Sequence, residues 1–118
     1  MRKETLDALD ELLERDGGLY SSRDILDAIN TGDMQSFVDG NDWVVTQIIN
    51  APRKRVMQIV FVYGDMEGLF RLEPVITEFA MDHGCKLIGA SARVGFEKHM
   101  TEGWTKSSVN YRKELRRV

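Results

Sequence analysis

The amino-acid sequence predicts an α+β domain in which a mixed β-sheet is flanked by helices. Leucines recur at helical spacing near the N-terminus, which indicates an amphipathic helix. Two runs rich in β-branched residues are joined by a short turn, which is typical of an antiparallel hairpin. A helical apolar stripe and another short strand follow, and this α/β-type order predicts a crossover between parallel strands. The 118 residues correspond to a single domain, 1–118.

Composition and charge exclude several classes of protein. With 42% hydrophobic residues and a net charge of −3, the chain has the composition of a globular protein. Charged residues are scattered throughout, so we expect no membrane partner and no span of about 20 apolar residues. Cys85 is the single cysteine, so no internal disulfide is expected, and with only two histidines the chain has few ligands for a metal. The first residues run directly into a charged helix, so we expect no signal peptide.

The N-terminal part is expected to form two helices. The first covers residues 3–15 within an N-terminal segment, 1–18, that ends in two glycines. The second covers residues 23–30, with Ser21 or Ser22 as its N-cap. Ser21 and Asp24 have the spacing of a capping box, with aspartate in place of glutamate.

The middle of the chain is expected to form strands. Residues 37–38 are a short strand, and residues 43–49 form a longer one that is rich in β-branched side chains. Residues 50–54 contain a proline and predict the hairpin turn. Residues 56–63 are the most hydrophobic run, so we expect a central strand that is buried on both faces.

The last third is expected to alternate between helix and strand. The apolar stripe over residues 69–80 predicts a helix, and Pro74 either begins that helix or kinks a longer one. Residues 85–90 then predict a strand parallel to the central one. A short helix over residues 93–101 and a closing strand over residues 104–115 complete the predicted fold.

Several local sequences support this element order. They are Val45-Thr46-Gln47, Phe79-Ala80, Gly84-Cys85, Arg93-Val94-Gly95-Phe96, Gly103-Trp104 and Tyr111-Arg112-Lys113-Glu114-Leu115. In this order the chain resembles the GNAT-type N-acetyltransferase fold over about residues 20–115. It is most similar to a divergent branch of small GNAT-like proteins associated with bacteriophage virions.

The resemblance implies a site for the pyrophosphate of acetyl-CoA on the loop before the helix that follows the central strand. Backbone N–H groups and the helix dipole attract anions there. In the family's motif Gly68 keeps a glycine, but Asp65 stands where Arg or Gln belongs and Phe70 where Gly or Ala belongs. Asp65 and Glu67 also bring negative charge next to an anion site, which costs about 1 kcal/mol per like-charge pair even in water. We therefore expect no cofactor.

If the chain is nevertheless an enzyme, the resemblance suggests its site residues. Gly64, Gly68 and Arg93 would contact acetyl-CoA. His99 takes the position of the family's proton donor, with Tyr63 as a second candidate, and a histidine has a pKa suited to acid catalysis near neutral pH. The helix that carries His99 differs from the family at other landmark positions, so the sequence by itself assigns no catalytic or cofactor-binding residue.

The leading hypothesis from the sequence is a structural or assembly protein of a bacteriophage particle, acting through protein–protein contacts and present in several copies. Other virion proteins or the chain itself are the expected partners, and the virion or the host cytoplasm is the expected location. Leu6, Leu9 and Leu13 form a candidate docking stripe, although leucines at this spacing also suit a core. The alternative is an active N-acetyltransferase that transfers acetyl from acetyl-CoA to a host amine or peptide.

Charge is unevenly divided along the chain. Residues 1–92 carry a net charge of −7 and residues 93–118 a net charge of +4. The basic side chains Arg112, Lys113, Arg116 and Arg117 are candidates for contact with an acidic partner. We do not expect nucleic acid to bind, because the acidic remainder would repel phosphates on either side of this tail.

Overall fold

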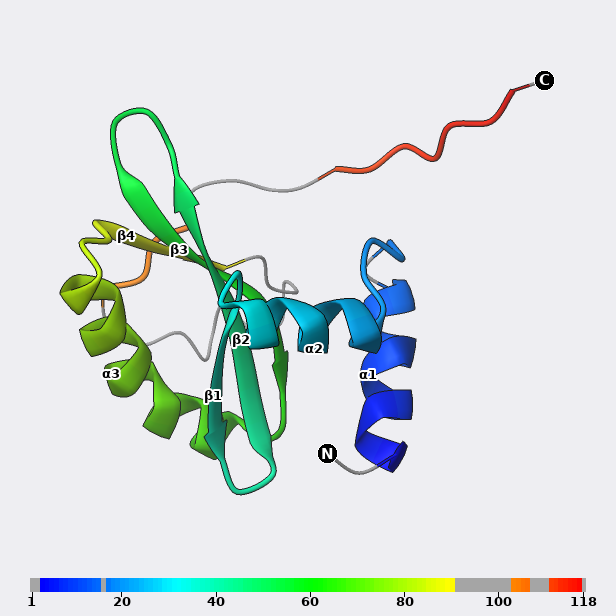
Figure 1. Ribbon diagram of the computed structural model, residues 1–118, viewed down its shortest axis with the longest axis horizontal. Helices are drawn as coiled ribbons and strands as arrows, with labels where there is room; N and C mark the ends of the chain where they lie inside the picture. Colours follow the sequence, from blue (N-terminus) through cyan, green and yellow to red (C-terminus); the bar gives the residue numbers. More distant parts are fainter. Residues whose placement is uncertain (1–2, 16, 91–102, 107–110, 118) are drawn as a thin grey trace.

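The computed structural model describes residues 3–15, 17–90, 103–106 and 111–117 (Figure 1). Seven helices and strands follow one another in this part of the chain. They are α1 (Lys3–Arg15), α2 (Ser22–Thr31), β1 (Gln35–Asp39), β2 (Asp42–Asn50), β3 (Arg55–Tyr63), α3 (Met66–Asp82) and β4 (Leu87–Ala90). The predicted helix over residues 93–101, with Arg93 and His99, lies outside the described residues.

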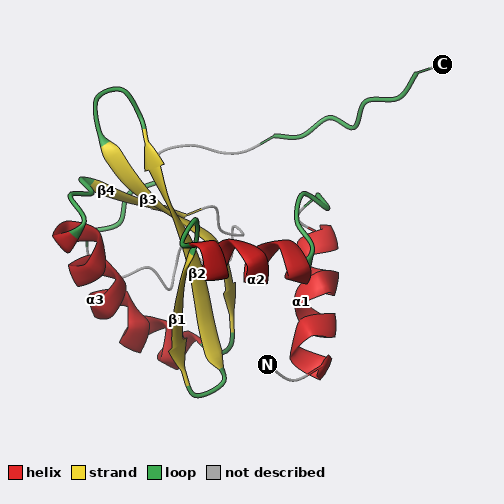
Figure 2. Ribbon diagram, viewed as in Figure 1, coloured by secondary structure: helices red, strands yellow, loops and turns green. Residues whose placement is uncertain are grey.

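The sheet has the predicted mixed topology. Its strand order is β1-β2-β3-β4; β1, β2 and β3 pair antiparallel, and β4 pairs parallel to β3. Helix α3 makes the crossover between β3 and β4 and covers one face of the sheet, while α2 and α1 lie on the other (Figure 2). The hairpin, the central strand and the crossover predicted from the sequence are therefore confirmed.

Each face of the sheet has its own hydrophobic cluster. Leu9 and Leu13 of α1 and Ile25 of α2 pack with Trp43, Val45 and Phe61 on one face. On the other face, Leu72, Ile76 and Ala80 of α3 pack with Val44 and Met57. Neighbouring residues of β2 thus enter different clusters, as the alternation of side chains along a strand requires.

A capping box and a carboxylate from α1 hold α2 in place. Ser21 is the N-cap: its side chain accepts a hydrogen bond from the backbone N–H of Asp24, and Asp24 accepts one in return, so the predicted capping box is present. Asp10 of α1 accepts hydrogen bonds from the backbone N–H of Ser22 at 2.7 Å and from its hydroxyl at 3.0 Å. This carboxylate joins the two helices. Gly32, with a φ of 86°, ends α2 in the left-handed conformation that favours glycine.

The structure corrects one predicted element and decides between the alternatives for Pro74. Pro74 lies inside α3, so the helix begins well before it. The predicted closing strand is wrong for its described residues, 104–106 and 111–115, which form no strand. Tyr111 and Leu115 are 90% and 85% exposed. They are the two large apolar side chains in a basic segment, and neither finds apolar surface to cover among the described residues.

The docking stripe expected on α1 also needs correction. Leu9 is fully buried and Leu13 is 4% exposed, and both belong to the core cluster of this chain. Leu6 is half-buried. Since burial of such leucines stabilises the fold itself, Leu9 and Leu13 are not available to a partner.

Candidate functional site

A β-bulge shapes the C-terminal half of β3. Val45 pairs with Phe61 and Thr46 with Ile59, which leaves Val60 as an extra residue without a partner on β2. A bulge inserts one residue and shifts the side-chain alternation by one. Met57 and Phe61 are four residues apart and would share a face in a regular strand, yet they are buried in different clusters. The bulge therefore buries β3 on both faces.

In the described part of the chain, β4 pairs with the N-terminal half of β3. The parallel ladder runs from the pair of Val56 and Leu87 to the pair of Ile59 and Ala90. Among the described residues, this ladder therefore covers the half of β3 that precedes the bulge, and the C-terminal half of β3 leads into the N-terminus of α3. This end of β3 is where the sequence predicts an anion site.

The loop between β3 and α3 is a tight turn closed by the chain's own side chains. Gly64 has a φ of 127°, which favours glycine. Asp65 is the N-cap of α3, and its carboxylate accepts a hydrogen bond from the backbone N–H of Gly68 at 2.9 Å. The backbone carbonyl of Asp65 accepts from the N–H of Leu69 at 3.2 Å. A helix N-terminus that would otherwise offer free N–H groups is thus partly capped from within.

Asp42, the first residue of β2, fills the space beside this loop. It is 6% exposed, and its Oδ1 accepts a hydrogen bond from the backbone N–H of Asp65 at 2.8 Å. A Cβ atom on Gly64 or on Gly68 would overlap the carboxylate of Asp42. The close approach that these two glycines permit is therefore used by a side chain of the same protein.

Arg71 of α3 balances part of this negative charge. Its Nε donates to Asp39 Oδ2 at 2.8 Å, and its Nη2 lies 3.7 Å from Asp42 Oδ2. The hydrogen bond to Asp39 raises the pKa of Arg71, and the charges of Asp39, Asp42 and Asp65 add to that effect. Three carboxylates with one guanidinium leave this end of α3 with an excess of negative charge.

Neither a metal site nor a membrane span is indicated in the described part of the chain. No group of three or more His, Cys, Asp or Glu side chains there has the geometry to hold a metal ion. No described helix is both long and apolar enough to cross a membrane.

Known protein structures share this architecture. A point mutant of TTHA1254 from Thermus thermophilus superimposes with a TM-score of 0.65 at 16% identity, covering 99% of this chain and 96% of the other. An acetyltransferase from Trypanosoma brucei gives a TM-score of 0.63 at 16% identity, covering 98% and 96%. The chain has a GNAT-like fold. No protein-family model and no curated protein sequence matches it.

A GNAT-like fold implies acetyl-CoA, with its pyrophosphate on the N–H groups that begin the helix after the central strand. In this chain that position is the N-terminus of α3. The N–H groups of Asp65 and Gly68 already donate to carboxylates, and the Asp42 side chain occupies the space beside both glycines. Phosphate oxygens brought to the same atoms would meet like charges, which cost about 1 kcal/mol per pair at 4 Å in water and about 4 at a partly buried site. These residues do not fit a pyrophosphate.

The other residues predicted for an enzyme are not assembled into a site by the described structure. Tyr63 ends β3 half-buried, and it packs against the cluster beneath α1 and α2. Gly64 and Gly68 do lie together, but around Asp42. The residues predicted to contact an acidic partner, Arg112, Lys113, Arg116 and Arg117, are exposed on the C-terminal segment.

Sequence reasoning missed Asp39, Asp42 and Arg71. The local sequence places Asp39 and Asp42 only in a turn, the one that joins β1 to β2. The register of β2 is the missing signal: because Trp43 pairs with Tyr63, the residue before Trp43 must lie beside Gly64. That neighbour relation cannot be read from either segment alone.

Proposed function

We propose that this chain is a non-catalytic GNAT-like domain that acts through protein–protein contacts and does not bind acetyl-CoA. The observation that supports the proposal is the occupation of the α3 N-terminus by Asp42 and Asp65. A carboxylate 6% exposed and hydrogen-bonded to a backbone N–H is part of the fold and cannot move aside without cost. The fold is retained, while its usual anion site serves as an internal cap.

Calorimetric titration with acetyl-CoA tests this proposal. We expect no binding stronger than about 1 mM, which corresponds to about 4 kcal/mol of binding free energy. Asp42→Ala removes the carboxylate beside Gly64 and Gly68 and is expected to raise the affinity for acetyl-CoA at least tenfold above that of the wild type. Asp39→Ala is the matched control, because it removes one negative charge from the same cluster but leaves the space beside the glycines filled. Sub-millimolar binding to the wild-type protein would overturn the proposal.

The setting of such a domain is a further part of the proposal. Similarity to phage virion proteins, found in the sequence alone, supports a structural or assembly role in a bacteriophage particle, with virion proteins or further copies of this chain as partners. Mass spectrometry of gradient-purified particles tests this role. We expect the chain to remain with the particles after a wash in high salt, and its loss in that wash would contradict a structural role.

An active N-acetyltransferase is the second candidate. The likeness to an acetyltransferase of Trypanosoma brucei favours it, as does the bulge at Val60. In that case His99 or Tyr63 would act as the acid, and transfer of radiolabelled acetyl to a peptide library would be detectable. His99→Ala and Tyr63→Phe would then separate the two residues, since only the true donor lowers the rate when it is replaced.

A further inference from the structure

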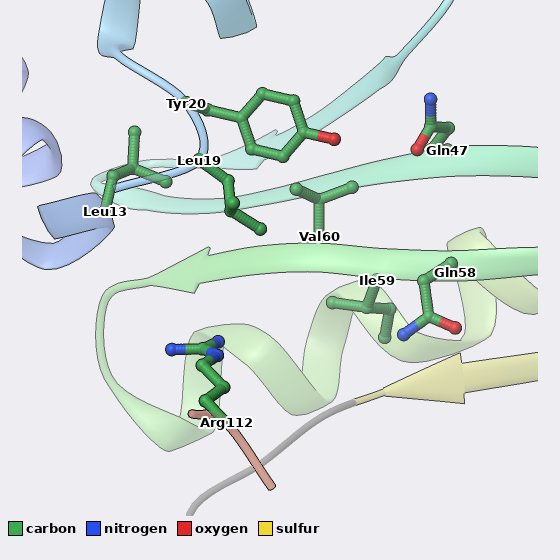
Figure 3. Close-up of a pocket in the computed structure, with 8 residues that line it drawn as sticks. All are labelled: Leu13, Leu19, Tyr20, Gln47, Gln58, Ile59, Val60 and Arg112. Carbon is green, nitrogen blue, oxygen red and sulfur yellow. The ribbon is translucent and has the colours of Figure 1, made fainter. Parts of the chain in front are cut away.

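A hollow lies on the other side of the sheet from α3, between the α1–α2 turn and strands β2 and β3 (Figure 3). Its volume is about 260 Å³. It is lined by Leu13, Leu19, Tyr20, Gln47, Gln58, Ile59, Val60 and Arg112. Pockets for drug-sized ligands are about 300–1,000 Å³, so this hollow suits a smaller group, such as the last one or two residues of a peptide.

Two amide side chains line the hollow. Gln47 and Gln58 are register partners across β2 and β3. Figure 3 shows their side chains extending in different directions, with Gln58 on the side of β4, where its Oε1 lies 2.6 Å from the position of a Cβ on Gly89. Both are half-buried, and neither amide makes a hydrogen bond with the described part of the chain. A pair of amides offers two NH2 groups, with four N–H donors, and two carbonyl acceptors, which match the C=O and N–H groups of a peptide backbone.

A guanidinium closes the hollow opposite Tyr20 (Figure 3). Arg112 reaches the α1–α2 turn, where its Nη1 would lie 3.1 Å from a Cβ atom on Gly17. Within the described residues, Arg112 forms no ion pair with a carboxylate. A guanidinium that is not paired with a carboxylate of its own chain is suited to bind another carboxylate through two parallel hydrogen bonds.

We infer that this hollow binds the C-terminal carboxylate of a partner polypeptide. In this arrangement Arg112 receives the carboxylate, Gln47 and Gln58 pair with the preceding peptide group, and the terminal side chain rests on Leu19 and Val60. The inference rests on the proposed function and names the chemistry of the partner. It does not depend on the loop at α3, which lies across the sheet.

The net charge of the chain outside its C-terminal segment favours a single carboxylate over a polyanion. Residues 1–92 carry a net charge of −7. Glu14 lies against the α1–α2 turn, with its Oε2 3.2 Å from the position of a Cβ on Gly18. This net charge would repel a nucleic acid or an acidic stretch. In a chain end preceded by basic residues, the carboxylate would pair with Arg112 and the basic side chains with acidic residues of this chain. Leu19, 74% exposed beside the hollow, offers apolar surface to the same chain end.

Two tripeptides test the inference by amide and side-chain NMR titration. The probe is acetyl-Lys-Ala-Leu with a free carboxylate, and its comparison is the same peptide ending in a carboxamide. We expect the free acid to bind with a dissociation constant of about 0.1–1 mM and to shift the side-chain amide signals of Gln47 and Gln58. The carboxamide is expected to bind about tenfold more weakly, which corresponds to about 1.4 kcal/mol.

Two variants of neighbouring residues distinguish binding in the hollow from an unspecific effect of net charge. Arg112→Ala is expected to lower the affinity for the free acid about tenfold, because it removes the carboxylate's partner. Lys113→Ala changes the net charge equally but does not line the hollow, so it is expected to change the affinity less than twofold. Equal binding of the two peptides, equal effects of the two variants, or no shifts at millimolar peptide would each overturn the inference.

A third peptide, acetyl-Lys-Glu-Leu-amide, carries its carboxylate on a side chain instead. If it binds as tightly as the free acid, the assignment to a chain end is wrong. Failure of all the peptides while acetyl-CoA also fails to bind would remove this inference and leave the proposed function intact.

Discussion

Replacement of Asp42 by alanine is expected to destabilise the protein by about 2 kcal/mol. Asp42 is 6% exposed and accepts a hydrogen bond from the backbone N–H of Asp65 at 2.8 Å. Hydrogen bonds that involve a charged group contribute about 1.5–3 kcal/mol to stability. In the variant the Asp65 N–H loses its acceptor, and only a water molecule that enters between the two glycines can replace it. The loss of the 3.7 Å contact with the exposed Arg71 adds little, because exposed ion pairs are weak.

Urea unfolding followed by tryptophan fluorescence measures this effect. With a slope of about 2 kcal/mol per molar urea, a loss of about 2 kcal/mol lowers the midpoint by about 1 M. Asp42→Asn keeps an oxygen acceptor in place and is expected to lose about half as much. Asp39→Ala removes the hydrogen bond to Arg71 without exposing a backbone N–H, so its midpoint should move far less. If Asp39→Ala and Asp42→Ala shift the midpoint equally, the role of Asp42 as a backbone cap is refuted.

Three further predictions concern the rest of the fold. Hydrogen bonds from Ser21 lower the pKa of Asp24 from its ordinary 3.8, so its contribution to stability is present above that value and is lost as the pH falls through the lowered pKa. Asp24→Asn should therefore be less stable than wild type at pH 7, and the difference should shrink as the pH falls below 3.8; a pH-independent difference would contradict this cause. Ser22→Ala removes the hydroxyl bond to Asp10 and is expected to cost about 1 kcal/mol in chemical unfolding, so an unchanged midpoint would show that this bond contributes nothing. Met57 is fully buried, so Met57→Ala should cost about 2–5 kcal/mol in the same assay and Met57→Leu less than about 1.5, and similar losses for both would argue against a cavity as the cause.

Local patterns in the sequence are sufficient to predict most of the elements. Ser21 and Asp24 predict the start of α2 because a capping box depends on residues three apart, which a reader of the sequence can see. The apolar run over residues 56–63 likewise predicts a strand between two others. The helix start and the strand both depend on residues that are close together in the sequence, and the structure confirms both.

The bulge at Val60 could not be predicted in this way. The run from Val56 to Tyr63 is apolar at nearly every position, so it carries no alternation that would reveal a change of face. The bulge follows from pairing with β2, where Phe61 must meet Trp43 on one face, edge to face at 5.0 Å, while Met57 meets α3 on the other. This run does not show which side chains share a face of the strand. The register of β3 is therefore decided by tertiary contacts and cannot be predicted from the run alone.

The prediction for the C-terminal segment failed for a related reason. A strand there would need an edge to pair with and a face to bury. Four basic side chains surround Tyr111 and Leu115, and the described residues present no apolar surface beneath them. Arg112 makes a different contact there, with the α1–α2 turn, and no property of residues 104–115 alone indicates it.

The loop at α3 illustrates how one side chain changes what a fold can bind. Gly64 and Gly68 leave the backbone open to close approach, and by itself this predicts an anion site. Asp42 enters from β2, accepts a hydrogen bond from the N–H of Asp65 and covers both glycines, so the same backbone becomes a structural junction between sheet and helix. Stability and anion binding therefore compete for the same atoms. Asp42→Ala should weaken the first as it restores the second, and a variant that changes only one of them would show that the two are not linked through Asp42.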